Sequence, residues 1–319
     1  FIPYTASGFK AVGTLFNSLF GFEYHTAMII GAVVIIAYTV MGGFLAVSTT
    51  DLVQSIFMTA ALIVVVCFGV SKAGGVDAVL ENARSLPGYL NLTQGYDVAT
   101  GSAASFGTLS ILSTLAWGLG YFGMPHILLR FMAIREEKEL NLSRRIATVW
   151  VVISMAIAIA IGVIGLAVTK AGSIPFLGSS AEAETIIIQL ANLMSQHGFL
   201  LIIAAGVIIS GILAATMSTA DSQLLAAASS VSQDLMQDFF GIKLSAKTTM
   251  LVARATVLVI AVISIFLAWD PNSSVFRVVS FAWAGFGAAF GPVVLFALFW
   301  KRSNKWGALA GMVSGGVMV

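Results

Sequence analysis

The sequence predicts an all-α integral membrane protein, and three observations predict this fold class. Of the 319 residues, 59% are hydrophobic and only 9% are charged, whereas a soluble domain has roughly 25% charged residues. The mean hydropathy is +0.99. Apolar runs recur at the length of about 20 residues that a membrane-spanning helix needs. The chain is therefore expected to lie in a lipid bilayer as several helices.

Seven windows are long and apolar enough to span a bilayer, and an eighth begins near Trp306 and is cut off by the end of the chain. Residues 1–20 are less apolar and read as a short interfacial helix or as the end of an earlier span. Because the first residue is not methionine and the last apolar run continues to Val319, we interpret the chain as an internal fragment with about seven full spans and one truncated span. The seven windows are 24–47, 52–71, 106–125, 146–169, 199–220, 249–268 and 275–299.

Two connections between the windows are long. Residues 72–105 are polar, and residues 181–197 are mostly apolar after a polar start. Ser179 followed three residues later by Glu182 is the pattern of a capping box. The second connection is therefore expected to hold a capped helix that lies on the membrane face.

Lysine and arginine residues predict the orientation in the membrane. Loops 126–145, 221–248 and 300–305 carry ten of these cations, and the loops on the other side carry four. Cytoplasmic loops are enriched in Lys and Arg, so the first three loops are expected to be cytoplasmic. The four cations assigned to the opposite side are Lys10, Lys72, Arg84 and Lys170.

The composition also excludes several classes of function. The net charge is only +2 and no basic run occurs, so a nucleic-acid partner is not expected. The single cysteine, Cys67, lies in an apolar segment and cannot form a disulfide framework. The three histidines are far apart and form no ligand-spaced pair. No motif for a nucleophile, a base or a cofactor is present, so an enzyme is not expected.

A cluster of polar residues interrupts the apolar window near residue 218. A charge at the centre of a membrane helix costs roughly 2.5–3.5 kcal/mol, so such a cluster indicates an ion or substrate path. At helical spacing, Gly211, Ala215, Ser218 and Ser222 line one stripe with Asp221 beside it. Small and hydroxyl residues also serve helix packing, and this alternative stays open. The cluster comprises Thr216, Ser218, Thr219, Asp221 and Ser222.

The window at 106–125 ends in a segment that disfavours a continuous helix. Three glycines and a proline follow Trp117 within eight residues, and each glycine costs about 1 kcal/mol and proline about 3 kcal/mol relative to alanine. A broken helix is a common feature of a transporter binding site. Trp117, Tyr121 and Pro125 are four residues apart, so an aromatic pair could stack on a small organic substrate. An interfacial aromatic belt is the alternative.

Two further segments resist a single interpretation. The window at 275–299 contains Gly285, Gly287 and Gly291, which suit either a flexible gating helix or a closely packed one. Asp51 follows three hydroxyl residues at the start of the window at 52–71. It could cap that helix, where a carboxylate suits the positive end of the dipole, or it could pair with a cation.

Four motifs together resemble the sodium:solute symporter family, in its bacterial sodium/proline branch. They occur in the family's order and cover most of the chain. The motifs are Gly42-Gly-Phe-Leu-Ala-Val-Ser48 with Asp51, Trp117-Gly-Leu-Gly-Tyr-Phe-Gly-Met-Pro-His-Ile-Leu-Leu-Arg-Phe-Met-Ala-Ile134, Ile212-Leu-Ala-Ala-Thr-Met-Ser-Thr219 and Ala282-Trp-Ala-Gly-Phe-Gly-Ala-Ala-Phe-Gly-Pro292.

The resemblance implies a fold of two inverted five-helix repeats. Residues 1–105 would then be the end of the first repeat, with an interfacial helix, two spans and an external loop. Residues 106–299 would be the second repeat with five spans, and residues 300–319 the start of a peripheral span. The first three core helices, including a broken helix that supplies the other half of the sodium site, would lie outside this chain.

The resemblance also implies site residues. Ala215 would bind sodium through its backbone carbonyl, with Ser218 and Thr219 as hydroxyl ligands. Asp51, Asp221 and Ser222 would form a second cation site, in which Asp221 replaces a serine of several relatives. Asp221 could instead be an acid at the cytosolic end of its helix. Trp117, Tyr121 and Pro125 would shape the substrate pocket, where Met124 departs from a frequent glutamine.

The implied activity is sodium-coupled import of a small amino acid, with L-proline as the leading candidate. Na⁺ is the coupling ion, and the bilayer is the partner. A family member for a sugar, sialic acid, carboxylate or vitamin is one alternative. The receptor part of a sensor kinase and an ion channel are two others.

Overall fold

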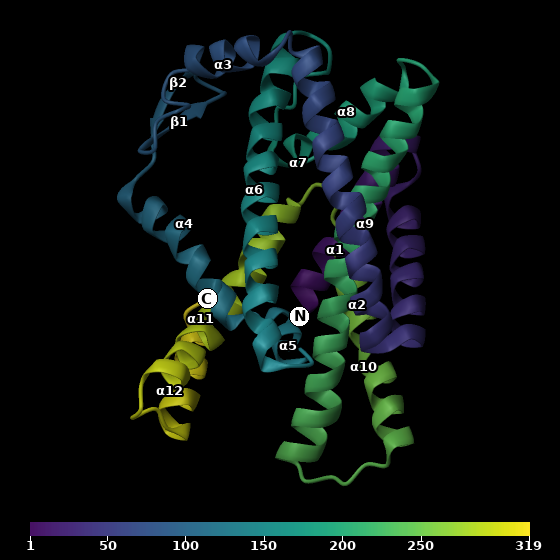
Figure 1. Cartoon of the computed structure of the whole chain (residues 1–319), viewed down its shortest axis with the longest axis vertical. Helices are drawn as coiled ribbons and strands as arrows, with labels where there is room; N and C mark the ends of the chain where they lie inside the picture. The colour runs from purple at the N-terminus through teal and green to yellow at the C-terminus, as the bar shows by residue number, and fades with distance from the viewer. The chain divides into compact units, whose positions relative to one another are not determined.

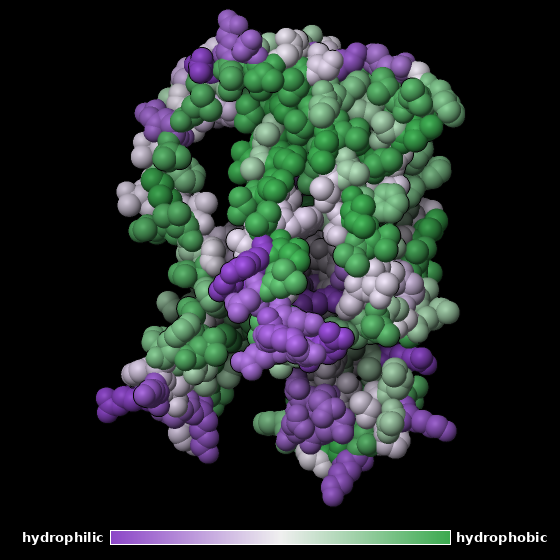
Figure 2. Space-filling view, viewed as in Figure 1, coloured by the Kyte–Doolittle hydropathy of each residue, from purple (hydrophilic) through white to green (hydrophobic).

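A computed structural model describes residues 1–319 as helices joined by short connections, with one small hairpin. Five helices are long and apolar enough to cross a membrane by length and composition: Tyr24–Lys72, Glu137–Lys170, Phe199–Phe239, Ala246–Leu267 and Val275–Phe299. Figure 2 shows that the sides of the long helices are mostly hydrophobic, while hydrophilic residues gather at helix ends and loops. The prediction of a multi-span helical membrane protein is confirmed at this level.

The chain folds into two compact units, and two long helices belong partly to each. Unit 1 comprises residues 1–62 and 178–282, and unit 2 comprises residues 63–177 and 283–319. Helices α2 (Tyr24–Lys72) and α11 (Val275–Phe299) therefore contribute to both units. The domain boundaries predicted from the family resemblance, at residues 105 and 299, follow the order of the repeats along the chain and differ from these compact units. They stay a prediction.

Unit 1 is built around a long central helix, α9 (Phe199–Ser229). Helix α1 (Ile2–Phe20) packs along α9 and α10 (Ala246–Leu267), and α8 (Ile186–Ser195) packs against α9. Gly8 permits this close contact because it has no side chain. An added Cβ atom would lie only 3.2 Å from the Ala220 Cβ. Helix α1 is thus part of the helix bundle. Its core includes Phe9, Val12, Met28, Ile35, Leu224, Val257 and Ala261.

Helix α2 joins the two windows predicted at 24–47 and 52–71. It runs for 49 residues, with non-helical backbone angles at Gly43, where φ is 64° and ψ is −166°. Because a positive φ is strained for residues with a Cβ atom, the bend falls on this glycine, and the two arms of α2 are not in line (Figure 1). Asp51 lies eight residues beyond Gly43, inside the second arm. The interpretation of Asp51 as a helix cap is therefore wrong.

Helix α9 extends further than the sequence predicts. A π-helix, η3 (Ser230–Phe239), continues it directly, so that one helical rod runs from Phe199 to Phe239. The prediction that residues 221–248 form a loop is therefore wrong. Only residues 240–245 connect this rod to α10, with a positive φ of 67° at Gly241.

Unit 2 contains the predicted break in the window at 106–125. Helix α4 (Thr108–Gly120) gives way to one short turn, η1 (Tyr121–Gly123), and α5 begins at the proline (Pro125–Met132). Helix α4 has 13 residues and rises only about 20 Å, so it does not reach across a bilayer alone. Unit 2 also holds α3 (Val76–Ser85), η2 (Glu137–Glu139), α6 (Leu140–Lys170) and α12 (Lys305–Val317).

The only strands form an antiparallel hairpin, which the sequence did not predict. Strand β1 (Gln94–Asp97) pairs with β2 (Ser102–Ser105) inside the connection at 72–105. The turn is closed by Asp97, whose carboxylate accepts hydrogen bonds from the Thr100 hydroxyl and the Ala99 N–H. These bonds, the Thr100 hydroxyl first, lower the pKa of Asp97.

A buried lysine holds the connection between α10 and α11. Lys10, only 2% exposed, lies inside α1, so its assignment to a loop is wrong. Its ammonium donates to the backbone carbonyls of Asp270 and Pro271 at 2.9 Å each. Burying an ammonium group costs free energy unless the group is hydrogen-bonded. The two carbonyls supply these bonds, and in return the lysine holds the connection between α10 and α11 in place.

Replacing Lys10 with methionine is expected to lower the melting temperature of the full-length protein in detergent. The change removes two hydrogen bonds from a charged donor to backbone carbonyls, and bonds of this kind are worth about 1.5–3 kcal/mol each. Lys301→Met is the matched control because Lys301 is exposed. Equal melting temperatures for the two variants would contradict the role of Lys10.

The start of α2 holds the same connection. The Tyr24 hydroxyl donates to the Ala268 carbonyl at 2.6 Å, and His25 Nε2 lies 3.0 Å from the Trp269 carbonyl. Glu23 accepts hydrogen bonds from the backbone N–H groups of His25 and of the next residue. These backbone bonds, that from His25 first, lower the pKa of Glu23 to about 2. The carboxylate therefore stays ionised at the positive end of the helix.

The predicted capping box is confirmed. Ser179 Oγ accepts from the Glu182 N–H, and Glu182 Oε2 accepts from the Ser179 N–H, at the start of α7 (Ser180–Ala183). The next carboxylate, Glu184, accepts from the N–H groups of Val275 and Phe276 at 2.9 and 3.0 Å. Glu184 thereby satisfies the first free N–H groups of α11.

Candidate functional site

The predicted sodium ligands form a cluster of oxygens on α9 in unit 1. The Ala215 carbonyl accepts from Ser218 Oγ at 3.2 Å and from Thr219 Oγ1 at 3.0 Å. All three residues are partly exposed, while Thr216 and Ala220 of the same helix are buried. The oxygens thus lie together on a part of the α9 surface that keeps some exposure.

The spacing of these oxygens suits a hard cation. Ligands roughly 2.3–2.6 Å from such an ion lie about 3.3–3.7 Å apart when they are at right angles. The observed separations of 3.2 and 3.0 Å are slightly shorter because the two hydroxyls donate to the carbonyl. If the hydroxyl protons turn away, all three oxygens can present lone pairs to one ion.

Gly211 has a different role from the rest of the predicted stripe. A Cβ atom on Gly211 would lie 2.4 Å from the Ala61 Cβ and 3.2 Å from the Phe57 carbonyl. This glycine therefore permits close packing of α9 against the second arm of α2. The helix-packing alternative is correct for Gly211, and the hydroxyls of Ser218 and Thr219 bond back to the Ala215 carbonyl of their own helix. Their role as sodium ligands stays a prediction.

Asp221 is fully buried and has a tyrosine partner that the sequence analysis missed. Its exposed fraction is 0%, and Oδ2 accepts a hydrogen bond from the Tyr38 hydroxyl at 2.8 Å. The same hydroxyl lies 3.2 Å from the Met217 carbonyl. Tyr38 was detectable as a polar group within an aliphatic window, since such a hydroxyl needs a partner in hydrocarbon.

Asp51 and Ser222 are the other members of the candidate second cation site. Asp51 lies on the second arm of α2, Ser222 directly follows Asp221 on α9, and both are partly exposed. All three residues belong to unit 1. Their role in binding a second cation stays a prediction.

The predicted substrate residues lie in unit 2, at the break after α4. Trp117 is partly exposed and Tyr121 is 41% exposed. Both contact a third aromatic residue, Trp283 of α11, which the sequence analysis did not select. The Trp117 and Trp283 rings stack with centroids 5.4 Å apart, and Tyr121 meets Trp283 edge-on at 4.7 Å. Pro125 begins α5, where its missing N–H is harmless.

Glycines bring α11 against this break. A Cβ atom on Gly123 would lie 2.4 Å from the Phe286 carbonyl and 2.7 Å from the Gly291 N–H nitrogen. A Cβ atom on Gly287 would lie 2.9 Å from the Gly120 Cα. The backbones of the two segments are thus in contact, as the end of α4 in Figure 1 shows. The packing interpretation of the α11 glycines is correct for Gly287 and Gly291.

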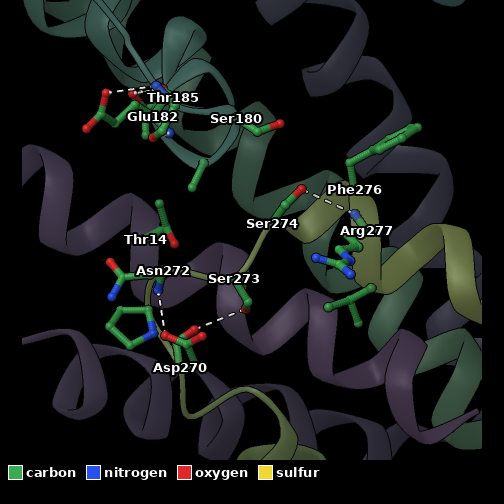
Figure 3. A pocket seen from close by; sticks show the side chains of 14 residues that line it. Thr14, Ser180, Glu182, Thr185, Asp270, Asn272, Ser273, Ser274, Phe276 and Arg277 are labelled. Atoms are coloured by element: carbon green, nitrogen blue, oxygen red, sulfur yellow. Dashed lines mark hydrogen bonds between the residues drawn. The ribbon is translucent and has the colours of Figure 1, made fainter.

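A polar pocket of about 980 Å³ lies elsewhere in unit 1 (Figure 3). Its charged residues are Glu182, Asp270 and Arg277. Glu182 is held by the capping box, and Asp270 Oδ1 accepts from the Asn272 N–H at 2.9 Å. These carboxylates stabilise their own turns, and the pocket contains none of the predicted site residues.

A sequence model of the sodium:solute symporter family matches residues 1–315. The chain belongs to this family of membrane transporters. It is 44% identical to the high-affinity proline transporter PutP of Bacillus subtilis (strain 168), covering 100% of this chain and 64% of that relative. It is also 44% identical to the sodium/proline symporter of Haemophilus influenzae, covering 99% and 61%.

A solved structure agrees with the family assignment at the level of the fold. It is a Na⁺-coupled sialic acid symporter in a substrate-bound outward-open state, with a TM-score of 0.65. The identity is 14%, and the match covers 99% of this chain and 71% of that chain. The chain itself spans about three fifths of the length of the two proline transporters.

Proposed function

We propose that the protein imports a small amino acid together with sodium by alternating access, and that L-proline is the leading candidate for this substrate. The observation that carries this proposal is the group of three oxygens at Ala215, Ser218 and Thr219 on a partly exposed part of the α9 surface. Relatives at 44% identity named as proline transporters support proline as the substrate.

Sodium is proposed to bind where the two hydroxyls now donate to the Ala215 carbonyl. The ion replaces these bonds, so its binding reorganises the local contacts of α9. Sodium and substrate must raise each other's affinity by the same factor. A membrane potential adds about 2.3 kcal/mol per charge for each 100 mV, which drives inward movement of the cation.

The predicted topology completes this proposal. Residues 106–299 form the second inverted repeat, and the bilayer surrounds the long apolar helices. The prediction of a loop at 126–145 is wrong as to structure, since α5, η2 and the start of α6 occupy most of it. This segment and residues 300–305 face the cytoplasm, together with the 240–245 connection that replaces the predicted longer loop. Asp51, Asp221 and Ser222 bind a second cation.

Uptake by membrane vesicles that contain the full-length protein tests the proposed function. Labelled L-proline is offered with an inward sodium gradient, with an equal potassium gradient, and in competition with a sugar, a sialic acid and a carboxylate. Accumulation of proline only with sodium is expected. Equal accumulation in both gradients, or competition by another solute alone, would overturn the assignment.

Replacing Tyr38 with phenylalanine is expected to increase the stabilisation that sodium gives to the full-length protein. The change removes a hydrogen bond to a buried carboxylate, worth about 1.5–3 kcal/mol, so the sodium-free protein becomes less stable. A bound cation can then compensate the carboxylate of Asp221. Thermal melting with and without sodium measures the effect, with Tyr96→Phe in the hairpin as control. A sodium response equal to that of the control would contradict it.

A further inference from the structure

The aromatic residues at the break in unit 2 are arranged around Trp283. This ring lies against both Trp117 and Tyr121, with centroid distances of 5.4 and 4.7 Å. Trp283 is 9% exposed, so it is the most buried of the three. It precedes Gly287 by four residues and therefore lies one turn from the contact of α11 with Gly120. Trp283 thus connects α11 to both predicted substrate residues.

The indole N–H of Trp283 has no acceptor. Its Nε1 atom is buried and makes no hydrogen bond. An indole N–H can only donate, and a buried donor without an acceptor costs about 1–3 kcal/mol. Phenylalanine would keep an aromatic ring at this position without that cost. A donor in such a place is therefore suited to a ligand that brings its own acceptor.

The donor cannot easily move to find an acceptor elsewhere. The backbone of α11 touches the segment from α4 to η1, because Gly123 leaves no space for a Cβ atom beside the Phe286 carbonyl. Gly291 makes a second, less tight contact, since an added Cβ atom would lie 3.3 Å from the Leu119 carbonyl. These contacts lie about one to two turns beyond Trp283 on the same helix. They hold Trp283 in place, so its N–H is positioned before any ligand arrives.

We propose that Trp283 contacts the transported amino acid and that its indole N–H donates to the substrate carboxylate. The faces of Trp117 and Tyr121 then receive the cationic amine, since a cation within about 6 Å of an aromatic centroid is attracted to the ring. This inference rests on the proposed function. An ionised carboxylate accepts a stronger hydrogen bond than the neutral carbonyl of an amide, so the site favours amino acids over their amides.

Two replacements of Trp283 in the full-length protein test this role. Trp283→Phe removes the N–H and part of the ring. Substitution by 3-benzothienylalanine replaces the N–H with sulfur and keeps the shape of the ring, which protects the packing. Trp300→Phe is the matched control because Trp300 lies exposed beyond the end of α11. The measurement is competition between labelled L-proline and unlabelled proline or prolinamide, both in binding and in sodium-driven uptake.

Both replacements are expected to weaken proline binding about tenfold, which is the loss of one charge-assisted hydrogen bond. The preference for proline over prolinamide should also fall, because the carboxylate loses a stronger hydrogen bond than the amide carbonyl does, while the half-saturating sodium concentration changes less than twofold. An unchanged preference in the benzothienyl protein would overturn the role of Trp283 and leave the proposed function intact. If the unmodified protein binds no proline, both proposals fail together.

Discussion

Replacing Gly123 with valine is expected to reduce sodium-driven proline uptake to background. The Cβ atom would lie 2.4 Å from the Phe286 carbonyl and 2.7 Å from the Gly291 nitrogen. Both neighbours are backbone atoms, which cannot move aside as the end of a flexible side chain can. Relief requires α11 to separate from the break after α4, and this moves Trp283 away from Trp117. Overpacking of this kind costs about 1–3 kcal/mol or more.

Gly118→Val in α4 is the matched control, because a Cβ atom on Gly118 meets nothing within 4 Å. Uptake is compared at equal amounts of protein in the membrane, measured by immunoblotting. The Gly118 variant should transport normally. If the Gly123 variant transports as well as this control, the backbone contact between η1 and α11 is not required for function.

The double replacement Ser218→Ala with Thr219→Ala is expected to raise the half-saturating sodium concentration by at least tenfold. Each hydroxyl lost removes an oxygen ligand, and polar contacts to a charged group contribute about 1.5–3 kcal/mol. The proline concentration for half-maximal uptake should change much less when sodium is saturating. Initial rates of uptake over a range of sodium concentrations provide the measurement.

Ser210→Ala is the control for this pair, since Ser210 is an exposed serine on the same helix. An unchanged sodium dependence in the double variant would show that the cation binds elsewhere. Equal losses in the apparent affinities for sodium and proline would instead indicate damage to the helix.

The features that the sequence predicted well depend on local physical chemistry. The break after Trp117 arises because glycine and proline weaken a helix at their own positions. The capping box at Ser179 and Glu182 is equally local, since its two residues are only three apart. The hydroxyls of Ser218 and Thr219 meet one carbonyl because helical spacing places them there.

The features that were missed depend on partners distant in the sequence. Tyr38 acquires its role through Asp221, 183 residues away, and Trp283 through one ring on α4 and one on η1. Neither partner can be identified from spacing along the chain. The rod beyond Asp221 was missed for another reason: its polar residues resemble a loop, although the backbone continues as a π-helix to Phe239.

The position of Ser218 along this rod determines how far the ion must travel to leave the protein. From Phe199 to Ser218 the helix rises about 29 Å, close to the 30 Å thickness of the hydrocarbon layer. If Phe199 marks the outer boundary, the cation already rests near the inner water layer while it is bound. Its exit then needs only a small local opening, whereas its arrival from outside crosses most of the low-dielectric region.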